Sequence, residues 1–164
     1  MNEMVPQSPE SESAALQRLG EIGLSNFAPY LMNRIMGRYN ADLRDEMASM
    51  GLTTPKMRSL AVLSVIDGLL IRDLAVYAVV EQSTLSRALD QLLADGLIRK
   101  APDAEDSRAT RIFITEAGRA SFERLWPSMA AIYSRMFHNI SDEEHARFVA
   151  TLQKMLNNVR KHDL

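Results

Sequence analysis

Apolar side chains recur at helical spacing along most of this chain. The first clear stripe begins near Ser25, repeats every four residues and runs to Gly51, where glycine favours a helix end. A helix of about 24 residues is about 36 Å long, and a small chain has little of its own to cover so long a stripe. We therefore expect it to pack against a partner subunit, with a long core helix inside a monomer as the alternative. The stripe consists of Phe27, Leu31, Ile35, Tyr39, Leu43 and Met47, widened by Met32 and Met36.

Two further helices are predicted between residues 53 and 80. The segment Thr53–Pro55 begins the first of them, because threonine is a good N-cap and proline is favoured at the first helical position. Gly68 follows its end. The apolar stretch 70–80 predicts a nearly buried third helix, although its composition would also suit a strand.

The segment from Glu81 to Gly96 shows the sharpest division between an apolar and a polar face. It predicts a helix that buries one face and ends at glycine. The apolar arc consists of Leu85, Ala88, Leu89, Leu92 and Leu93. The opposite side carries Ser83, Arg87, Asp90, Gln91 and Ala94, with Thr84 and Ser86 at its margins.

A hairpin and two helices complete the chain. Residues 97–100 and 111–115 are predicted as short strands joined by a polar loop. Thr115 caps the next helix, and Pro127 within it is expected to kink the helix or divide it in two. Ser141 and Glu144 form the capping box that begins the last helix.

This order of elements predicts a mainly α-helical fold with a small β-hairpin wing. Three helices followed by a hairpin, over residues 53–115, is the order of a winged helix-turn-helix lobe. Charge is uneven, since residues 1–24 hold four glutamates and one arginine, whereas the remainder is nearly balanced. We expect an acidic, disordered tail over 1–24, a dimerisation helix over 25–52, a DNA-binding lobe over 53–115 and dimerisation helices over 116–164.

The composition excludes several classes of chemistry for this protein. The 164 residues carry a formal net charge of -2 and no cysteine, which excludes disulfides, thiol redox sensing and cysteine-bound metals. The three histidines make a thin ligand set, so we expect no metal and no cofactor. No catalytic motif is present, so we do not expect an enzyme. The apolar runs are short for a membrane helix and the first residues do not resemble a secretory signal, so we expect no membrane partner.

The central motifs resemble the MarR (multiple-antibiotic-resistance regulator) family of winged helix-turn-helix transcription factors. The resemblance covers about residues 27–159 and is carried by two regions. The first is the helix from Gln82 to Leu92 with the following Gly96-Leu97-Ile98. The second is the wing, Asp103-Ala104-Glu105-Asp106-Ser107-Arg108, followed by Ile112-Phe113-Ile114-Thr115 and Gly118.

Two positions depart from the family's pattern. The helix-turn-helix corner reads Ala78-Val79-Val80-Glu81 and lacks the usual glycine, and Leu70-Ile71-Arg72 stands where a serine or threonine usually caps the third helix. The altered corner and the acidic wing favour one alternative function, a winged-helix dimer that binds protein and has lost DNA binding.

The resemblance implies a sequence-specific transcriptional regulator that acts in the cytoplasm at the nucleoid, and we interpret it as a repressor. A two-fold homodimer would read a pseudo-palindromic operator with recognition helices about 34 Å apart. The family also implies a small-molecule effector, aromatic or phenolic, bound between the dimer lobe and the DNA lobe. Candidates to line that cleft are Met36, Tyr39, Met57, Leu60 and Trp126, for which ordinary core packing is the alternative.

The polar face of the helix after Glu81 is the candidate for base reading. Hydroxyl groups in its first turn can serve bases or phosphates, and free backbone N–H groups there favour phosphate. Arg87 can make a bidentate contact to a guanine edge. A solvated helix face is the alternative. The candidate contacts are Ser83, Thr84, Ser86, Arg87 and Gln91.

The wing supplies the remaining candidates. By resemblance Arg108 enters the minor groove, where narrow A·T-rich segments attract arginine, and Asp106 supports either this arginine or the loop. Asp103 and Glu105 are interpreted as solvated turn residues that reduce non-specific affinity. Candidate phosphate contacts are Arg99, Lys100, Arg111, Lys56 and Arg58.

Overall fold

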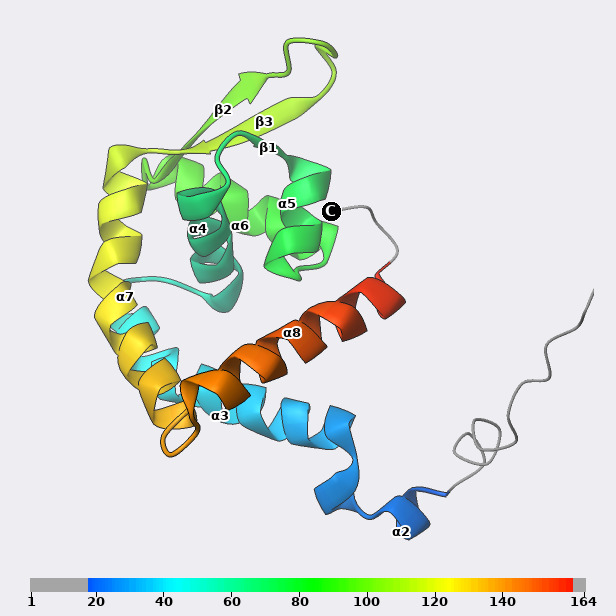
Figure 1. Ribbon diagram of the computed structural model, residues 1–164. Coiled ribbons are helices and arrows are strands. Elements are labelled where there is room, and N and C mark those ends of the chain that lie inside the picture. The colour runs from blue at the N-terminus through cyan, green and yellow to red at the C-terminus, as the bar shows by residue number, and fades with distance from the viewer. Residues whose placement is uncertain (1–17, 161–164) are drawn as a thin grey trace, which may run out of the picture. The chain divides into compact units, whose positions relative to one another are not determined.

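The computed structural model describes residues 18–160 and divides the chain into two units, residues 1–42 and 43–164. It confirms the mainly α-helical fold with a small β-sheet (Figure 1). The boundary between the units lies inside a helix, ahead of the expected boundary at residue 52, because Leu43 and Met47 are buried in the core of the second unit. None of the helices in the described part of the chain is both long and apolar enough to cross a membrane.

The first unit contains two short turns and most of the long helix. Helix α2 (Leu19–Ile22) and the 3-10 turn η1 (Leu24–Asn26) precede α3 (Ala28–Ser49). Helix α3 confirms the predicted long helix, and Gly51 follows it with a φ of 66°. Of the predicted disordered tail, residues 1–17 lie outside the described residues. The end of that segment was predicted to be disordered but contains the short helix α2. The Glu21 carboxylate accepts the Arg18 backbone N–H in its first turn.

The second unit is built around α4 (Thr54–Val65), the helix expected after Thr53. It contacts α5 (Ile71–Ala78), α6 (Gln82–Ala94), α7 (Glu116–Met136) and the sheet. Burying each leucine side chain contributes about 1.5–3 kcal/mol, so this core dominates the stability of the unit. The fully buried leucines and isoleucines include Leu60, Leu63, Leu74, Leu85, Leu89, Leu92, Ile112 and Leu125.

The predicted hairpin is present and belongs to a three-stranded antiparallel sheet. Strands β2 (Ile98–Pro102) and β3 (Thr110–Ile114) pair with each other, and β1 (Leu69–Leu70) pairs with the other edge of β3. The sequence did not predict β1, because two residues carry no periodicity and form a strand only by pairing with β3. The third helix accordingly begins at Ile71, and its N-cap, Leu70, provides no side-chain cap.

The start of α7 is locked to the end of α6. The Thr115 hydroxyl accepts the Gly118 backbone N–H at 3.0 Å and donates to the Gly96 carbonyl at 2.7 Å. A Cβ on Gly118 would lie 2.0 Å from the Leu97 carbonyl oxygen, so only glycine permits this approach. The structure thereby explains why Thr-x-x-Gly stands at this point of the sequence.

The two C-terminal helices lie where the sequence places them. Helix α7 continues through Pro127, so the proline does not divide it in two. Helix α8 (Asp142–Val159) begins with the predicted capping box, in which the Ser141 hydroxyl accepts the Glu144 N–H and the Glu144 carboxylate accepts the Ser141 N–H.

The corner between α5 and α6 contains a residue in the left-handed conformation. Val79 has a φ of 52° and a ψ of 50°, where a β-branched side chain is strained. The turn still closes as a helix C-cap, since the Val80 N–H bonds the Ala75 carbonyl at 3.1 Å. The Arg58 guanidinium also donates to the Val79 carbonyl at 3.1 Å. The absence of glycine at this corner therefore adds backbone strain at Val79, but the hydrogen bonds of the turn still form.

Replacing Val79 by glycine should stabilise the protein. Left-handed backbone costs a residue with a Cβ about 1–2 kcal/mol, and the added freedom of glycine in the unfolded chain returns about 0.4–1 kcal/mol of that. We expect the free energy of unfolding of Val79→Gly to rise by up to about 1 kcal/mol, measured by urea denaturation. Val65, also exposed but with negative φ, is the matched control, and Val65→Gly should lower the free energy of unfolding. Equal losses in both variants would show that Val79 is not strained.

Candidate nucleic-acid interface

Helix α6 presents one buried and one exposed face. Leu85, Ala88, Leu89 and Leu92 are buried, as predicted, whereas Leu93, at the edge of that arc, is 41% exposed and does not belong to the core. The predicted contact residues all have exposed side chains; they are Ser83, Thr84, Ser86, Arg87 and Gln91. The local sequence therefore buries one face of the helix and leaves the polar face at the surface.

Glu81 caps this helix, a role that the sequence analysis missed because glutamate is not a preferred N-cap. Its carboxylate accepts the Ser83 backbone N–H at 3.2 Å and also the Ser83 hydroxyl. The hydroxyl bond, followed by backbone N–H groups of Thr84 and Ser83 and the charge of Arg87, lowers the pKa of Glu81. A carboxylate at this helix end repels phosphate, which corrects the expectation that the free N–H groups here favour it.

The first-turn hydroxyls are partly engaged within the protein. Ser83 donates to Glu81, and the Ser86 hydroxyl donates to the Gln82 carbonyl at 3.0 Å. These two hydroxyls can therefore serve a nucleic acid as acceptors while they keep their internal bonds. The guanidinium of Arg87 presents a bidentate donor on the same exposed helix face.

The base of the wing is held by Asp103 and Arg111. The Asp103 carboxylate is buried and accepts the backbone N–H groups of Glu105 and Asp106 at 2.9 and 3.0 Å. It also pairs with the Arg111 guanidinium, which donates in addition to the Gly68 carbonyl at 2.7 Å. The Asp106 N–H, then the Glu105 N–H and Arg111, lower the pKa of Asp103. Asp103 is thus not a solvated turn residue. Arg111 holds the wing together through these bonds, and its contact with phosphate stays a prediction.

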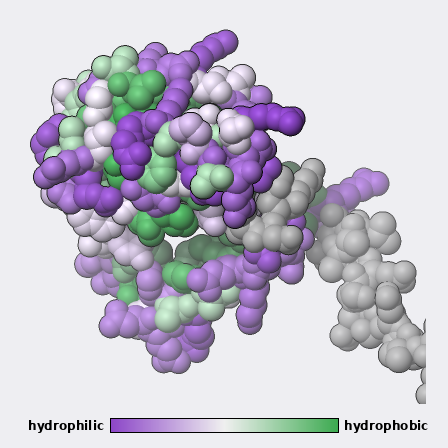
Figure 2. All heavy atoms as spheres, turned by 90° about the horizontal axis from the view of Figure 1, so that it is seen from above, coloured by the Kyte–Doolittle hydropathy of each residue, from purple (hydrophilic) through white to green (hydrophobic). Residues whose placement is uncertain are grey.

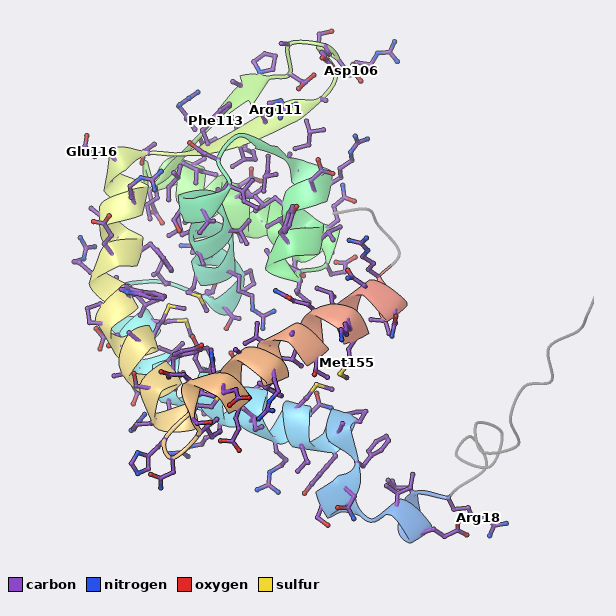
Figure 3. The ribbon with its side chains drawn as sticks, viewed as in Figure 1. Arg18, Asp106, Arg111, Phe113, Glu116 and Met155 are labelled. Atoms are coloured by element: carbon purple, nitrogen blue, oxygen red, sulfur yellow. The ribbon has the colours of Figure 1, made fainter. Side chains whose placement is uncertain are left out.

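The tip of the wing is a tight turn that exposes Arg108. The Asp106 carboxylate accepts the Arg108 backbone N–H at 3.0 Å, and the Asp106 carbonyl accepts the Ala109 N–H at 2.8 Å. The expected support by Asp106 is therefore present, and it acts on the loop. Figure 3 shows Asp106 at the tip of the hairpin and Arg111 and Phe113 along β3.

Strand β2 carries two cations at the surface. The Arg99 guanidinium lies over the Phe113 ring, 4.0 Å from its centroid, and Lys100 Nζ lies 2.9 Å from the Asp90 carboxylate on α6. The surface ion pair of Lys100 is worth about 0–1 kcal/mol and an exposed cation–π contact such as that of Arg99 about 0.5–1 kcal/mol, so both side chains can leave these partners for phosphate at little cost. Because Asp90 lies on the polar face of α6, this contact places β2 beside that face. Figure 2, seen from the wing end, shows mostly hydrophilic side chains among smaller hydrophobic areas.

Lys56 is held inside the protein, whereas the contact of Arg58 with phosphate stays a prediction. Lys56 is only 7% exposed, and its Nζ lies 3.1 Å from the Asp95 carboxylate and 3.4 Å from the Gly51 carbonyl. It ties the start of α4 to the end of α6. The prediction of Lys56 as a phosphate contact is wrong for this conformation, because the side chain is buried and its charge is already paired.

The candidate ligand residues fall into both units. In the second unit, Met57 and Leu60 are core residues, whereas Trp126 is 56% exposed. In the first unit, Met36 is exposed, and burial raises the pKa of the Tyr39 phenol. Their grouping around one ligand stays a prediction. Within residues 18–160, no three histidine, aspartate or glutamate side chains are arranged to hold a metal ion.

Removing the charge of Asp103 should loosen the wing at neutral pH and have less effect in acid. The lowered pKa means that the folded state favours the carboxylate, so its contribution is present above a pH of about 4 and is lost as the pH falls through the folded pKa. We expect Asp103→Asn to lower Tm at pH 7, with a difference from the wild type that shrinks below pH 4. The exposed neighbour offers a control, Glu105→Gln, which should leave Tm unchanged. A pH-independent difference would contradict this role.

Replacing Lys56 by methionine should cost stability. Lys56→Met keeps the apolar length and removes the bonds to Asp95 and Gly51, at a cost of about 1 kcal/mol because Asp95 is half exposed. Urea denaturation measures this loss, and Arg87→Ala, at an exposed position, should show none. Unchanged stability together with weaker nucleic-acid binding would instead restore Lys56 as a phosphate contact.

A family model and a solved structure identify the family of this chain. The family model described as "MarR family" matches residues 50–109. A crystal structure of a MarR family transcriptional regulator from Silicibacter pomeroyi is 58% identical, with a TM-score of 0.87, over 90% of this chain and 100% of that one. The transcriptional repressor IacR of Pseudomonas putida is 26% identical over 139 residues, 85% of this chain and 83% of that protein.

The same fold occurs in a ligand-bound protein. CouR from Rhodococcus jostii RHA1, solved with p-coumaroyl-CoA, is 21% identical, with a TM-score of 0.72 over 85% of this chain and 99% of that one. The winged sheet, the capped helix α6 and these matches lead to one conclusion. The chain belongs to the MarR family of transcriptional regulators.

Proposed function

We propose that this protein binds a pseudo-palindromic operator as a homodimer and represses transcription there. The observation that carries the proposal is the exposed polar face of α6 beside a wing held rigid by Asp103 and Arg111. Helix α6 enters the major groove, and the wing follows the adjacent minor groove. As a DNA-bound regulator, the protein acts at the nucleoid in the cytoplasm.

Within this proposal, the site residues divide between base reading and phosphate binding. Arg87, with Gln91 one turn further along α6, reads base edges, and Arg108 enters the minor groove at A·T-rich flanks. Arg99 and Lys100, on opposite faces of β2, bind phosphates on the two sides of that strand. Asp106 holds the turn that presents Arg108.

Homodimerisation is supported by apolar surface on the helices outside the winged lobe. Helix α8 exposes several large apolar side chains, as does α3 in the first unit, and water is an unfavourable partner for such surfaces. We propose that residues 25–52 and 116–164 form the dimer interface and that 53–115 form the DNA-binding lobe. The exposed side chains include Leu31, Ile35, Phe148, Met155, Leu156 and Val159.

We propose in addition that a small aromatic or phenolic effector releases the protein from its operator. CouR, with the same fold, was solved with p-coumaroyl-CoA, a phenolic acyl thioester. The candidate residues for such a site are Met36, Tyr39, Met57, Leu60 and Trp126. Of these, Trp126 combines a large aromatic surface with exposure to a ligand.

DNA binding is tested by selecting genomic fragments that bind the purified protein and measuring affinity at several salt concentrations. The wild type should lose affinity steeply as salt rises. Arg87→Ala should remove about 1–3 kcal/mol of discrimination between the selected site and random DNA. Arg108→Ala should weaken binding chiefly at A·T-rich flanks.

Arg18→Ala serves as the control, because Arg18 is an exposed arginine ahead of α2, outside both the winged lobe and the proposed dimer interface. It should change neither affinity nor preference. If the wild type showed no salt-dependent affinity, the proposal would fail in favour of a winged-helix dimer that binds protein.

A further inference from the structure

A surface notch lies between the wing and the start of α5. It has a volume of about 230 Å³ and lies where β1 passes into α5, opposite the end of the wing loop. Figure 1 shows β1 beside β3, close to the hairpin that carries the loop. The notch is lined by Leu70, Ile71, Arg72, Arg108, Ala109 and Thr110.

The two charged residues of the notch are arginines, one on each wall. Arg72 is 77% exposed in its side chain and makes a loose pair with the adjacent Asp73, with Nε 3.4 Å from the carboxylate. Such a surface pair is worth little and leaves most of the guanidinium donors for another group. Arg108 is exposed, and its backbone is fixed by Asp106. Two guanidinium groups at one small notch suit an anion with several acceptor oxygens.

Both walls of the notch belong to one rigid piece. Leu70 pairs with Arg111 in the sheet, so the wall that carries Arg72 follows directly from a strand joined to β3. The Arg111 guanidinium also bonds the Gly68 carbonyl and Asp103, which joins β1 to the wing loop. The backbone positions that carry the two arginines are therefore fixed relative to each other before any ligand arrives, and a fixed backbone reduces the cost of binding.

We infer that the notch binds a backbone phosphate of DNA, at the edge of the minor groove that the wing follows, with Arg72 as its principal donor. The inference rests on the proposed function. It adds a contact from the first helix of the helix-turn-helix to those from α6 and the wing. A phosphate contact of this kind fixes the register of the protein on the duplex and carries no sequence information.

The test measures the dependence of DNA affinity on salt for the full-length protein. Each phosphate contact contributes about 0.9 to the slope of log affinity against log salt, so Arg72→Ala should lower the slope by about one per protomer, equally on selected and random DNA. Arg72→Lys should retain the slope because it keeps the charge. Asp73→Asn should strengthen binding, because it removes a carboxylate next to the phosphate. Arg18→Ala, at an exposed arginine outside both the winged lobe and the proposed dimer interface, should change nothing.

The outcomes separate this inference from the proposed function. A wild type with specific, salt-dependent binding and an unchanged slope in Arg72→Ala would overturn the notch alone. A wild type with no such binding would overturn the proposed function and the notch together. A third arm titrates inorganic phosphate at constant ionic strength and follows Tm without DNA. Stabilisation of the wild type but not of Arg72→Ala, with an unchanged DNA slope, would assign the notch to a free anion and overturn the inference.

Discussion

The Arg111 guanidinium joins three segments that are far apart in the sequence. It pairs with Asp103 at the start of the wing loop and donates to the Gly68 carbonyl ahead of β1, while its own backbone pairs with Leu70 in the sheet. Asp103 in turn organises the loop through two backbone N–H groups. The stiffness of the wing, the fixed position of Arg108 and the walls of the notch beside Arg72 all depend on this one pair of side chains.

Much of the fold could be predicted from the sequence because the apolar pattern and the helix caps are local signals. The buried arc of α6, the hairpin and the capping box at Ser141 all follow from local spacing. Strand β1 could not be predicted in this way, since its two residues become a strand only through β3. The same holds for the side-chain partners of the site. Nothing near Lys56 in the sequence indicates that Asp95, 39 residues away, pairs with it.

Ion pairs within the winged lobe neutralise part of its positive charge. Of the predicted cations, Lys56 and Arg111 hold the protein together, and Glu81 brings negative charge to the start of the recognition helix. The cations that the proposed function assigns to DNA are placed individually on α6, β2, the wing and the start of α5, and the near-neutral composition of the chain adds no general excess of positive charge. Under the proposed function, binding by a protein with this charge distribution depends more on the fit of Arg87 and Arg108 to one site than on general attraction to DNA.

The contact at Gly118 has a mechanical consequence. The first turn of α7 lies so close to the Leu97 carbonyl that no Cβ fits between them, and Thr115 bonds the Gly96 carbonyl at the same joint. Packed groups this close move as one body, because interiors at this density transmit displacement and do not absorb it. The start of α7 and the end of α6 are therefore coupled and move together. A tilt of α7, imposed at any of its 21 residues, changes the orientation of the recognition helix α6.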